Sequence, residues 1–350
     1  PPDRTPRKPT GTIALRGITL HNLRGLDADF PLGVFTAVTG VSGSGKSTLV
    51  TRVLADVVRD HLGTAEEPAG AQDPEAEDAA DDRARIASVE GLSAVGRLVR
   101  VDQKPIGRTP RSNLATYTGL FDAVRKVFAA TDESRARGYT AGRFSFNVAA
   151  GRCQTCQGEG FVAVELLFLP GTYAPCTACH GARYHPETLE ISYRGRSVAD
   201  VLAMTVDTAA EFLADVPAAA RSLRTLREVG LGYLRLGQPA TELSGGEAQR
   251  IKLATELQRT RRGHTLYLLD EPTTGLHPAD TEVLLRQLHG LVDAGHTVVV
   301  VEHDMGVVAG ADHVIDLGPG GGADGGRIVA AGTPREVAAT PGSRTAPYLA

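Results

Sequence analysis

The feature that most constrains the fold of this 350-residue chain is a glycine-rich loop between an apolar strand and a helix. The strand is predicted to end at Thr39, and Gly40-Val-Ser-Gly-Ser-Gly-Lys-Ser47 follows it directly. This segment fits the pattern GxxxxGK[ST], and a helix is expected from Lys46 to Asp60. Such a loop holds phosphate with backbone N–H groups and the positive end of the helix. The pattern therefore predicts an α/β fold with a nucleotide phosphate site.

The residues of this loop have separate expected tasks. Lys46 is expected to reach the β- and γ-phosphates, and the Ser47 hydroxyl is expected to bind Mg²⁺. The glycines let the backbone close around the phosphates. The residues predicted to bind the nucleotide here are Gly40, Ser42, Gly43, Ser44, Gly45, Lys46, Ser47 and Thr48.

A second apolar strand, Leu266–Leu269, ends in the acidic pair Asp270 and Glu271. Asp270 at the strand end suits Mg²⁺ binding, and Glu271 suits the polarisation of an attacking water. Strand and helix then alternate to Leu317, which predicts the closing half of a parallel sheet. The expected elements are a helix over 280–294, a strand over 297–301, a helix over 305–309 and a strand over 314–317. The glycine cluster 318–326 has no helix after it, so a dinucleotide site there is not expected.

The segment Leu243-Ser-Gly-Gly-Glu-Ala-Gln-Arg250 opens another predicted helix. Ser244 and Glu247 have the spacing of a capping box, while Gly245 and Gly246 leave backbone N–H groups uncovered at the helix start. A second anion site is therefore expected there. A well-capped helix would explain the Ser and Glu alone, but it explains the whole segment poorly.

This segment resembles the signature of the ATP-binding-cassette (ABC) ATPases. In that family the signature of one cassette contacts ATP held on the phosphate loop of another, so the resemblance implies pairing with a second ABC cassette. It also makes His303 the histidine that senses the γ-phosphate. Gln103 matches the family glutamine that touches Mg²⁺ and couples ATP to an inserted domain. The implied reaction is the hydrolysis of ATP, with Glu271, His303 and Gln103 as the catalytic group.

All four cysteines lie between these motifs, in the spacing C-x2-C-x19-C-x2-C. That spacing predicts a four-thiolate zinc site without an open position for catalysis, formed by Cys153, Cys156, Cys176 and Cys179. A strand over 161–168 and a turn at Pro170-Gly171 are expected to form a hairpin between the pairs. Disulfides and a c-type haem, to which Cys176-Thr-Ala-Cys179-His180 would attach, are the disfavoured alternatives.

Charge is segregated along the chain, although the net charge is only −4. Residues 66–82 carry eight acids and no base, whereas residues 97–152 carry eleven bases against four acids. The basic stretch suits a polyanionic partner, or else a solvated face. No apolar run reaches the roughly 18 residues of a membrane span, and no signal peptide is evident, so a cytoplasmic chain with no membrane partner is expected.

These patterns predict a domain order. Residues 1–10 are expected to be a disordered arm, and 63–92 a flexible acidic insertion. Residues 11–62 and 231–350 are expected to form the ATP-binding core. Residues 93–230 are expected to form an inserted helical signature and DNA-binding domain, which contains a zinc hairpin module at 150–184. The fold class is therefore α/β, an ABC-type P-loop ATPase with two insertions.

Taken together, the chain resembles the C-terminal cassette half of the UvrA subunit of the bacterial excision-repair nuclease. The matching stretches include 21–24, 35–47, 101–113, 142–147, the cysteine module, 229–238, 243–257 and 270–277. The resemblance implies ATP-dependent recognition of damaged double-stranded DNA in nucleotide excision repair, action as a cassette dimer, and loading of a UvrB-type helicase. The implied cofactors are ATP, Mg²⁺ and Zn²⁺, with no nuclease residues in the chain. The candidate DNA contacts are Lys104, Arg108, Arg111, Arg143 and Arg152.

Some features depart from that family. A UvrA chain usually carries two cassettes, with its partner-binding region in the N-terminal half, and His303-Asp304 replaces the usual His-Asn. Because the sequence starts at Pro1, a piece of a longer protein is expected. Two other functions stay open: a UvrA-like drug self-resistance protein, and, more remotely, the ATPase subunit of an ABC transporter.

Overall fold

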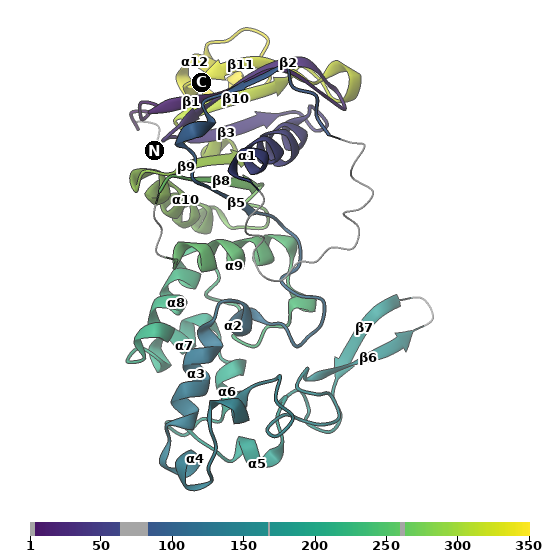
Figure 1. The fold of residues 1–350 in the computed structure, drawn as a ribbon, viewed down its shortest axis with the longest axis vertical. Coiled ribbons are helices and arrows are strands. Elements are labelled where there is room, and N and C mark those ends of the chain that lie inside the picture. Colours follow the sequence, from purple (N-terminus) through teal and green to yellow (C-terminus); the bar gives the residue numbers. More distant parts are fainter. Residues whose placement is uncertain (1–3, 64–82, 167–168, 260–262) are drawn as a thin grey trace. The chain divides into compact units, whose positions relative to one another are not determined.

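The chain divides into two compact units in the computed structural model (Figure 1), which describes residues 4–63, 83–166, 169–259 and 263–350. The first unit comprises Pro1–Asp102 and Arg261–Ala350, and the second comprises Gln103–Thr260. The first unit is discontinuous because the second is inserted between two of its strands. The predicted boundaries at 93 and 231 differ from this division, because strand β5 falls in the first unit and helix α9 in the second.

A six-stranded sheet forms the centre of the first unit, in the order β11-β10-β3-β9-β8-β5. Every neighbouring pair is parallel except β10 and β11. β3, β8 and β9 are buried along almost their whole length, as expected for parallel strands covered on both faces. The strands are β3 (Phe35–Gly40), β5 (Arg97–Val101), β8 (Thr265–Asp270), β9 (Thr297–Val301), β10 (His313–Gly318) and β11 (Arg327–Gly332).

A second, antiparallel sheet of the first unit has the order β2-β1-β4, with β1 at Gly11–Leu20, β2 at Leu23–Leu32 and β4 at Ser88–Glu90. Residues 64–82 of the expected acidic insertion lie outside the described residues. The end of that predicted segment is ordered, because Arg85 exchanges two backbone hydrogen bonds with Thr19 and β4 pairs with β1.

The predicted alternation of strands and helices in the first unit is confirmed. The helix after the phosphate loop begins with a π-helical stretch, Thr48–Leu54, and continues as α1 (Ala55–Leu62). Its buried side chains join an apolar core together with residues of β1, β2, β3, β8, β9 and β10. The remaining helices of this unit are α10 (Pro278–Asp293), α11 (Met305–Ala309), α12 (Pro334–Ala338) and α13 (Ala346–Leu349).

Part of the segment 1–10, which was expected to be a disordered arm, is attached to the first unit through Arg7. Arg7 donates to Asp312 Oδ2 at 2.8 Å and to Asp293 Oδ1 at 2.7 Å, and its backbone N–H also reaches Asp312. Composition could not show this, because both acids lie near the other end of the chain. Two charged contacts compensate the entropy lost by this polar segment.

The second unit consists of short helices and one hairpin. Its first two helices are α2 (Leu114–Tyr117) and α3 (Leu120–Ala129). Gly119 separates them with φ of 77°, a left-handed conformation that glycine adopts without strain. The other helices are α4 (Asp132–Ala136), α5 (Pro186–Leu189), α6 (Val198–Ala203), α7 (Val206–Phe212), α8 (Pro217–Glu228) and α9 (Gly245–Leu257).

The hairpin of the second unit pairs β6 (Phe161–Leu166) with β7 (Leu169–Pro175), and it extends away from the helices of its unit (Figure 1). Pro170 and Gly171, predicted as the turn, belong to β7; residues 167–168 between the strands are outside the described part. Among the described residues of both units, none of the helices has the length and apolarity that crossing a membrane requires.

Candidate nucleotide and metal sites

The phosphate loop joins β3 to the helix that begins the apolar core of the first unit. Gly40 has φ of 141°, and a Cβ there would lie 2.1 Å from the carbonyl oxygen of Leu317, so only glycine fits. Lys46 is 6% exposed, and its Nζ donates to Gly40 O at 2.7 Å and Val41 O at 3.2 Å. Burial lowers the pKa of Lys46, opposed by the charges of nearby acids. The ammonium group of Lys46 is therefore held by two carbonyl oxygens of the loop itself.

Ser44 supports the assignment of this loop to phosphate. Its hydroxyl is buried and, among the described residues, has no hydrogen-bond partner. A buried polar atom without a partner costs about 1–3 kcal/mol, and a phosphate oxygen would satisfy it. The donor set of the loop, with backbone N–H groups, this hydroxyl and the Lys46 ammonium, fits an anion.

The glycine cluster 318–326, for which no dinucleotide site was expected, packs directly against the phosphate loop. Gly322 N donates to Gly43 O at 2.9 Å, and Gly326 N donates to Ser44 O at 2.8 Å. A Cβ on Gly325 would lie 2.9 Å from Ser44 Cα. Glycines are required here because two backbones touch. Sequence reasoning missed this supporting role, since the two segments are far apart in the chain.

The acid strand lies beside the loop, as predicted. The Ser47 hydroxyl donates to Asp270 Oδ2 at 3.3 Å, which brings the two predicted Mg²⁺ ligands together. Burial raises the pKa of Asp270, and the neighbouring charge of Glu271 raises it further. A hydroxyl and a carboxylate in this arrangement are oxygen ligands of the kind Mg²⁺ prefers.

Glu271 and His303 form the second contact of this site. His303 Nε2 and Glu271 Oε1 are 2.6 Å apart, although one residue follows β8 and the other follows β9. Glu271 has φ of 46°, a left-handed conformation that costs a non-glycine residue energy and is common at functional sites. The geometry aims the carboxylate at the imidazole, and either could orient a water.

Glu302 is a residue of this site that sequence reasoning missed. It is 2% exposed, and its Oε1 accepts hydrogen bonds from the Thr273 N–H at 3.1 Å and the Thr273 hydroxyl at 2.6 Å. Its Oε2 accepts from the N–H groups of His303 at 3.0 Å and Asp304 at 3.2 Å. The carboxylate therefore ties the turn after Glu271 to the turn that carries His303. The sequence signal that could have identified Glu302 is an acidic residue directly after an apolar strand and directly before a histidine.

The signature segment begins α9 in the second unit. Ser244 caps the helix by accepting from Glu247 N at 3.2 Å, and Glu247 Oε1 accepts from Ser244 N at 2.9 Å. The hydroxyl of Tyr233 donates to the other oxygen of Glu247. Gln103 lies against the start of this helix, because a Cβ on Gly245 would be 3.1 Å from its Oε1. The predicted capping box is therefore present, beside the predicted glutamine.

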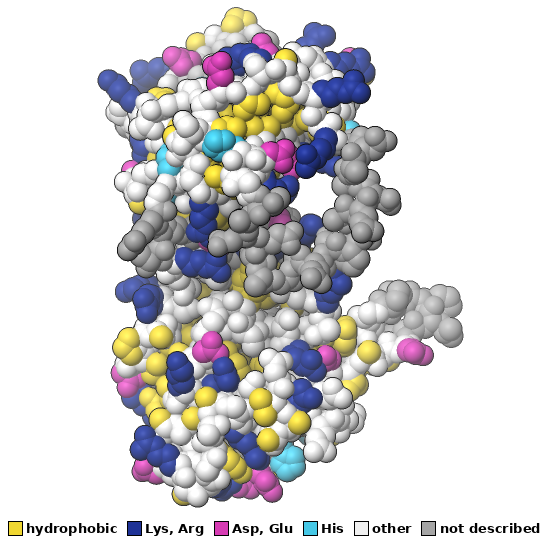
Figure 2. Space-filling view, viewed as in Figure 1, with side chains coloured by type: hydrophobic (Ala, Val, Ile, Leu, Met, Phe, Trp, Pro, Cys, Tyr) yellow, Lys and Arg dark blue, Asp and Glu magenta, His cyan; other side chains and the backbone are white. Residues whose placement is uncertain are grey.

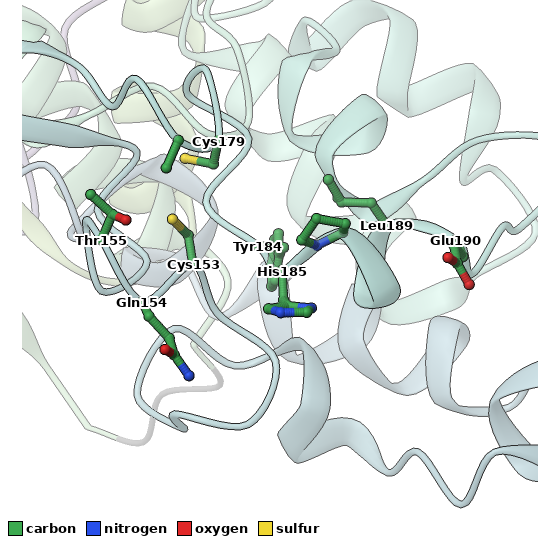
Figure 3. Close-up of a pocket in the computed structure, with 10 residues that line it drawn as sticks. Cys153, Gln154, Thr155, Cys179, Tyr184, His185, Leu189 and Glu190 are labelled. Carbon is green, nitrogen blue, oxygen red and sulfur yellow. The ribbon is translucent and has the colours of Figure 1, made fainter.

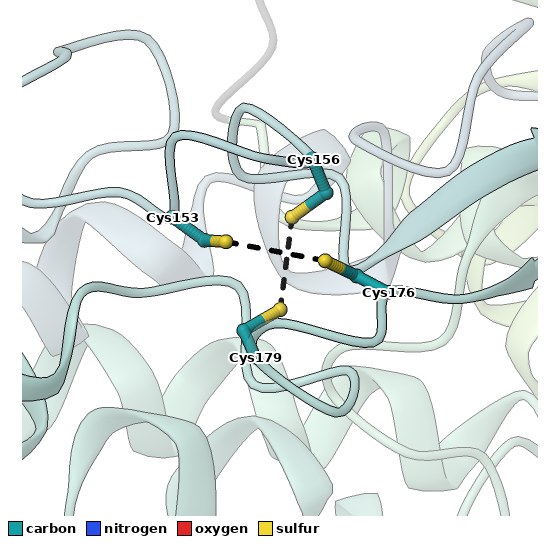
Figure 4. A group of neighbouring side chains, drawn as sticks. All are labelled: Cys153, Cys156, Cys176 and Cys179. Atoms are coloured by element: carbon teal, nitrogen blue, oxygen red, sulfur yellow. Dashed lines mark hydrogen bonds between the residues drawn. The ribbon is translucent and has the colours of Figure 1, made fainter.

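The four cysteine sulfurs point toward one another from the two CxxC turns (Figure 4). All four lie within 4.8 Å of one another; Cys153 and Cys176 are 4.0 Å apart, and Cys156 and Cys179 are 3.7 Å apart. A tetrahedral site with Zn–S bonds of about 2.3 Å has sulfur–sulfur edges of about 3.8 Å. The separations therefore fit a four-coordinate metal. Disulfides are absent, since all four cysteines are free.

The surroundings shift the pKa values of the cysteines in opposite directions, and burial raises that of Cys156 to about 12. Burial raises the pKa of Cys176, but hydrogen bonds from the N–H groups of Cys179 and Ala178 outweigh it and lower the pKa to about 7. A cavity of about 470 Å³ opens beside the cluster, lined by Thr155, Tyr184, His185 and other residues (Figure 3). The group of His, Cys, Asp and Glu side chains that could hold a metal nevertheless contains only the four cysteines.

The candidate DNA contacts differ in their surroundings. Arg143 donates to Thr188 Oγ1 at 2.9 Å and lies 4.2 Å from the centre of the Tyr139 ring. Arg152 donates to Phe146 O at 2.9 Å, and Arg111 donates to Gln157 O at 3.1 Å. Lys104 and Arg108 are exposed. On the visible face of the second unit, Lys and Arg side chains lie in separate groups among apolar and acidic ones (Figure 2).

No protein-family model matches the chain. It is 55% identical over 342 residues to UvrABC system protein A of Mycobacterium bovis, which covers 98% of this chain and 34% of that protein. It is 52% identical over 350 residues to UvrABC system protein A of Bacillus subtilis, covering 100% of this chain and 35% of the other. The chain thus spans about a third of the length of these curated relatives.

A solved structure agrees with these sequence matches. The crystal structure of UvrA2 from Deinococcus radiodurans covers 99% of this chain with a TM-score of 0.89 and 63% identity, over 41% of its own length. The predicted α/β ABC fold with an inserted helical domain and a four-cysteine module is confirmed. The chain is therefore a UvrA-type ABC cassette, equivalent to about one third of the curated UvrA chains.

Proposed function

We propose that this chain is the ATP-hydrolysing segment of a UvrA-type protein that recognises damaged duplex DNA in nucleotide excision repair. The observation that carries the proposal is the hydrogen-bonded set in the first unit. Ser47 of the loop contacts Asp270, and His303 contacts the neighbouring Glu271, so three separate motifs meet at one site. The name shared by the curated relatives, a component of the UvrABC system, supports the repair role.

In this proposal the loop and Lys46 bind the phosphates of ATP. Ser47 and Asp270 would hold Mg²⁺, which supplies positive charge next to the phosphates. Glu271 orients the attacking water and accepts its proton, and His303 holds the Glu271 carboxylate in place. Burial raises the pKa of Asp270, and a cation bound beside this carboxylate would act in the opposite direction.

The second unit would contribute the signature turn, which completes the ATP site of another cassette. The turn formed by Ser244, Gly245, Gly246 and Glu247 would face ATP bound on another cassette, and the N–H groups of its two glycines would be presented to the phosphates. Gln103 would link that site to the inserted domain. This arrangement requires a second cassette, supplied by another copy or by the rest of a UvrA-type chain. A structural zinc ion on the four cysteines, a duplex DNA and a UvrB-type helicase complete the proposed partners.

Two measurements on the zinc-loaded chain test this function. Binding is measured to a duplex with one bulky adduct and to the same duplex without it, over a range of salt concentrations. We expect preference for the adduct and an affinity that falls steeply with salt, because phosphate contacts release counterions. Absence of binding at the lowest salt would contradict the DNA role. A drug-adducted duplex, as a third substrate, separates general repair from drug self-resistance.

The second measurement is the ATP hydrolysis rate per chain as protein concentration rises. A composite site needs two cassettes, so specific activity should increase until pairing saturates. A specific activity that is constant with concentration, in a sample shown by sedimentation to be monomeric, would contradict the paired-cassette mechanism.

A further inference from the structure

Arg183 is a buried cation beside the cysteine cluster that has no part in the function proposed above. Arg183 is only 4% exposed. Nη1 donates to Pro110 O at 2.9 Å and to Gly158 O at 3.3 Å, and Nη2 donates to Gly237 O at 3.1 Å. One planar guanidinium therefore joins three segments that are far apart in the sequence.

The backbone of Arg183 is tied to the cluster itself. Cys153 N donates to Arg183 O at 2.9 Å. Burial raises the pKa of Cys179, while hydrogen bonds from backbone N–H groups, that of Arg183 first, act in the opposite direction. Arg183 has φ of 72°, and a Cβ on Gly160 would lie 3.0 Å from its Cγ. Backbone and side chain are therefore both fixed in position, one by the cysteine turns and the other by the carbonyls.

The charge of Arg183 suits that location. Its three contacts are to carbonyl oxygens, which carry no net charge. A buried cation needs a compensating charge nearby. Four thiolates with one divalent metal carry a net charge of −2. Burial lowers the pKa of Arg183, and the charges of Cys156 and Cys179 are among those that oppose this.

Two of the three segments reached by the guanidinium, those of Pro110 and Gly237, are hydrogen-bonded to each other. Ala115 N donates to Leu236 O at 2.9 Å, and Ala240 N donates to Ser112 O at 2.8 Å. We call residues 110–115 and 236–240 the paired segments. The first lies downstream of Gln103, and the second leads into the signature. Lys252 of the signature helix α9 donates to Lys104 O at 2.7 Å. This helix therefore also contacts the residue that follows Gln103, upstream of residues 110–115.

We propose that Arg183 is a positioning residue that links the cysteine cluster to the paired segments, and through them to Gln103 and the signature turn. The link to the paired segments stands on geometry alone; its effect on ATP turnover rests on the proposed function. Metal loading would fix the Arg183 backbone, and the guanidinium would transfer that order to the two segments. A metal-stabilised module would thereby act on residues that touch nucleotide.

The test is hydrogen exchange measured by mass spectrometry on the zinc-loaded chain, together with zinc content. Arg183→Gln removes the charge and one arm of the fork, and Arg183→Lys keeps the charge but cannot span Pro110 and Gly237 together. Arg194→Gln is the matched control, since Arg194 lies in the same unit in an exposed ion pair with Asp215. Neither hydrogen exchange nor zinc content depends on ATP or DNA. The two measurements therefore test the link whether or not the proposed function is correct.

We expect Arg183→Gln to retain zinc and to exchange about tenfold faster in the paired segments, with the rest of the second unit unchanged. Arg183→Lys should behave in the same way, and Arg194→Gln should match the parent chain. Unchanged exchange in the paired segments would overturn the proposal, as would faster exchange spread evenly over the unit. If Arg183→Gln loses its zinc, the proposal is tested on Arg183→Lys instead. Unchanged exchange in the paired segments of that variant, or faster exchange spread evenly over the unit, would overturn it.

Discussion

The phosphate loop and the cysteine module both gather residues from distant parts of the chain, but different forces hold them. The loop stands on a large apolar core that includes Leu49, Val50 and residues of six strands. Among the described residues, the buried cluster at the cysteines consists of Cys153, Cys156 and Cys176, with Val162 and Cys179 packed against it. The first site is therefore shaped by the apolar core of its own unit, whereas we expect the second, with little apolar burial, to need a metal to hold its shape.

Removal of the metal is expected to give the largest difference between the two regions. Cys176→Ser should destabilise the second unit by on the order of 5 kcal/mol or more and leave the first unit almost unchanged. Calorimetry, with hydrogen exchange to assign each transition, measures this. Thr177→Ser, an exposed change in the same turn, serves as the control. Equal destabilisation of both units would break the comparison.

Replacement of Glu271, the proposed catalytic carboxylate, is expected to give the next largest effect. Glu271→Gln should lower ATP turnover about a thousandfold, because an amide cannot accept the proton of the attacking water. ATP affinity should change little, since the loop and Lys46 are intact. Equilibrium binding and single-turnover hydrolysis separate the two quantities. Glu282→Gln, an exposed change on α10, is the control, and fast turnover by the Glu271 variant would exclude it as the base.

Glu302→Gln tests whether the first site depends on its buried carboxylate. Both oxygens of Glu302 face donors, so an amide must turn its NH₂ group toward one pair of them. We expect a loss of about 2 kcal/mol in the unfolding free energy of the first unit and a fall of about tenfold in turnover. Thr273→Val removes one of the donors, and the double variant should cost less than the sum. Full additivity would mean that the Thr273 contact is unimportant.

The pH dependence of the first unit sharpens the comparison further. Burial, aided by Arg4 and Arg7, lowers the pKa of His289 to about 4, against the opposing charges of Asp312 and Asp293. The unfolded chain binds this proton near pH 6.5, so stability is present above that pH and is lost as pH falls toward 4. The loss should be about 1–2 kcal/mol. His289→Gln should flatten the slope of unfolding free energy against pH; an unchanged slope would exclude His289.

The smallest expected effects separate two kinds of arginine in the second unit. Arg108→Gln should weaken duplex binding a few-fold and reduce the salt slope by about one. Arg143→Gln should instead lower stability by about 1 kcal/mol, because Arg143 is held by Thr188 and Tyr139. Binding titrations at several salt concentrations and thermal unfolding measure the two outcomes. A reduced salt slope for Arg143→Gln would make it a phosphate contact after all.

Sequence predicted the parts of this molecule that depend on local order. The strand, loop and helix around Lys46, the alternation after Thr265 and the capping box at Ser244 each follow from neighbouring residues. The cysteine cluster could also be predicted, because thiolate spacing within each turn is local and metal chemistry supplies the rest. Their roles in ATP and zinc binding remain predictions.

The remainder depends on contacts between distant segments. Arg7 meets Asp312, the 318–326 glycines meet the phosphate loop, and Arg183 meets Pro110 and Gly237. No periodicity or spacing reveals such pairs. Composition also could not show that Arg111, Arg143 and Arg152 donate to oxygen atoms of the protein, because these contacts are invisible in the sequence.

The sheet order of the first unit has a consequence for how the chain folds during synthesis. Arg97 pairs with Thr265 and Phe35 pairs with Val298, so the whole second unit is made before β5 finds its neighbour. The second unit is one continuous segment, and its contacts can form as soon as it has been synthesised. Its prior collapse would shorten the loop that the sheet must close. The inserted unit therefore determines the order of folding. β3 and β5 stay unpaired in their sheet until the last third of the chain has been synthesised.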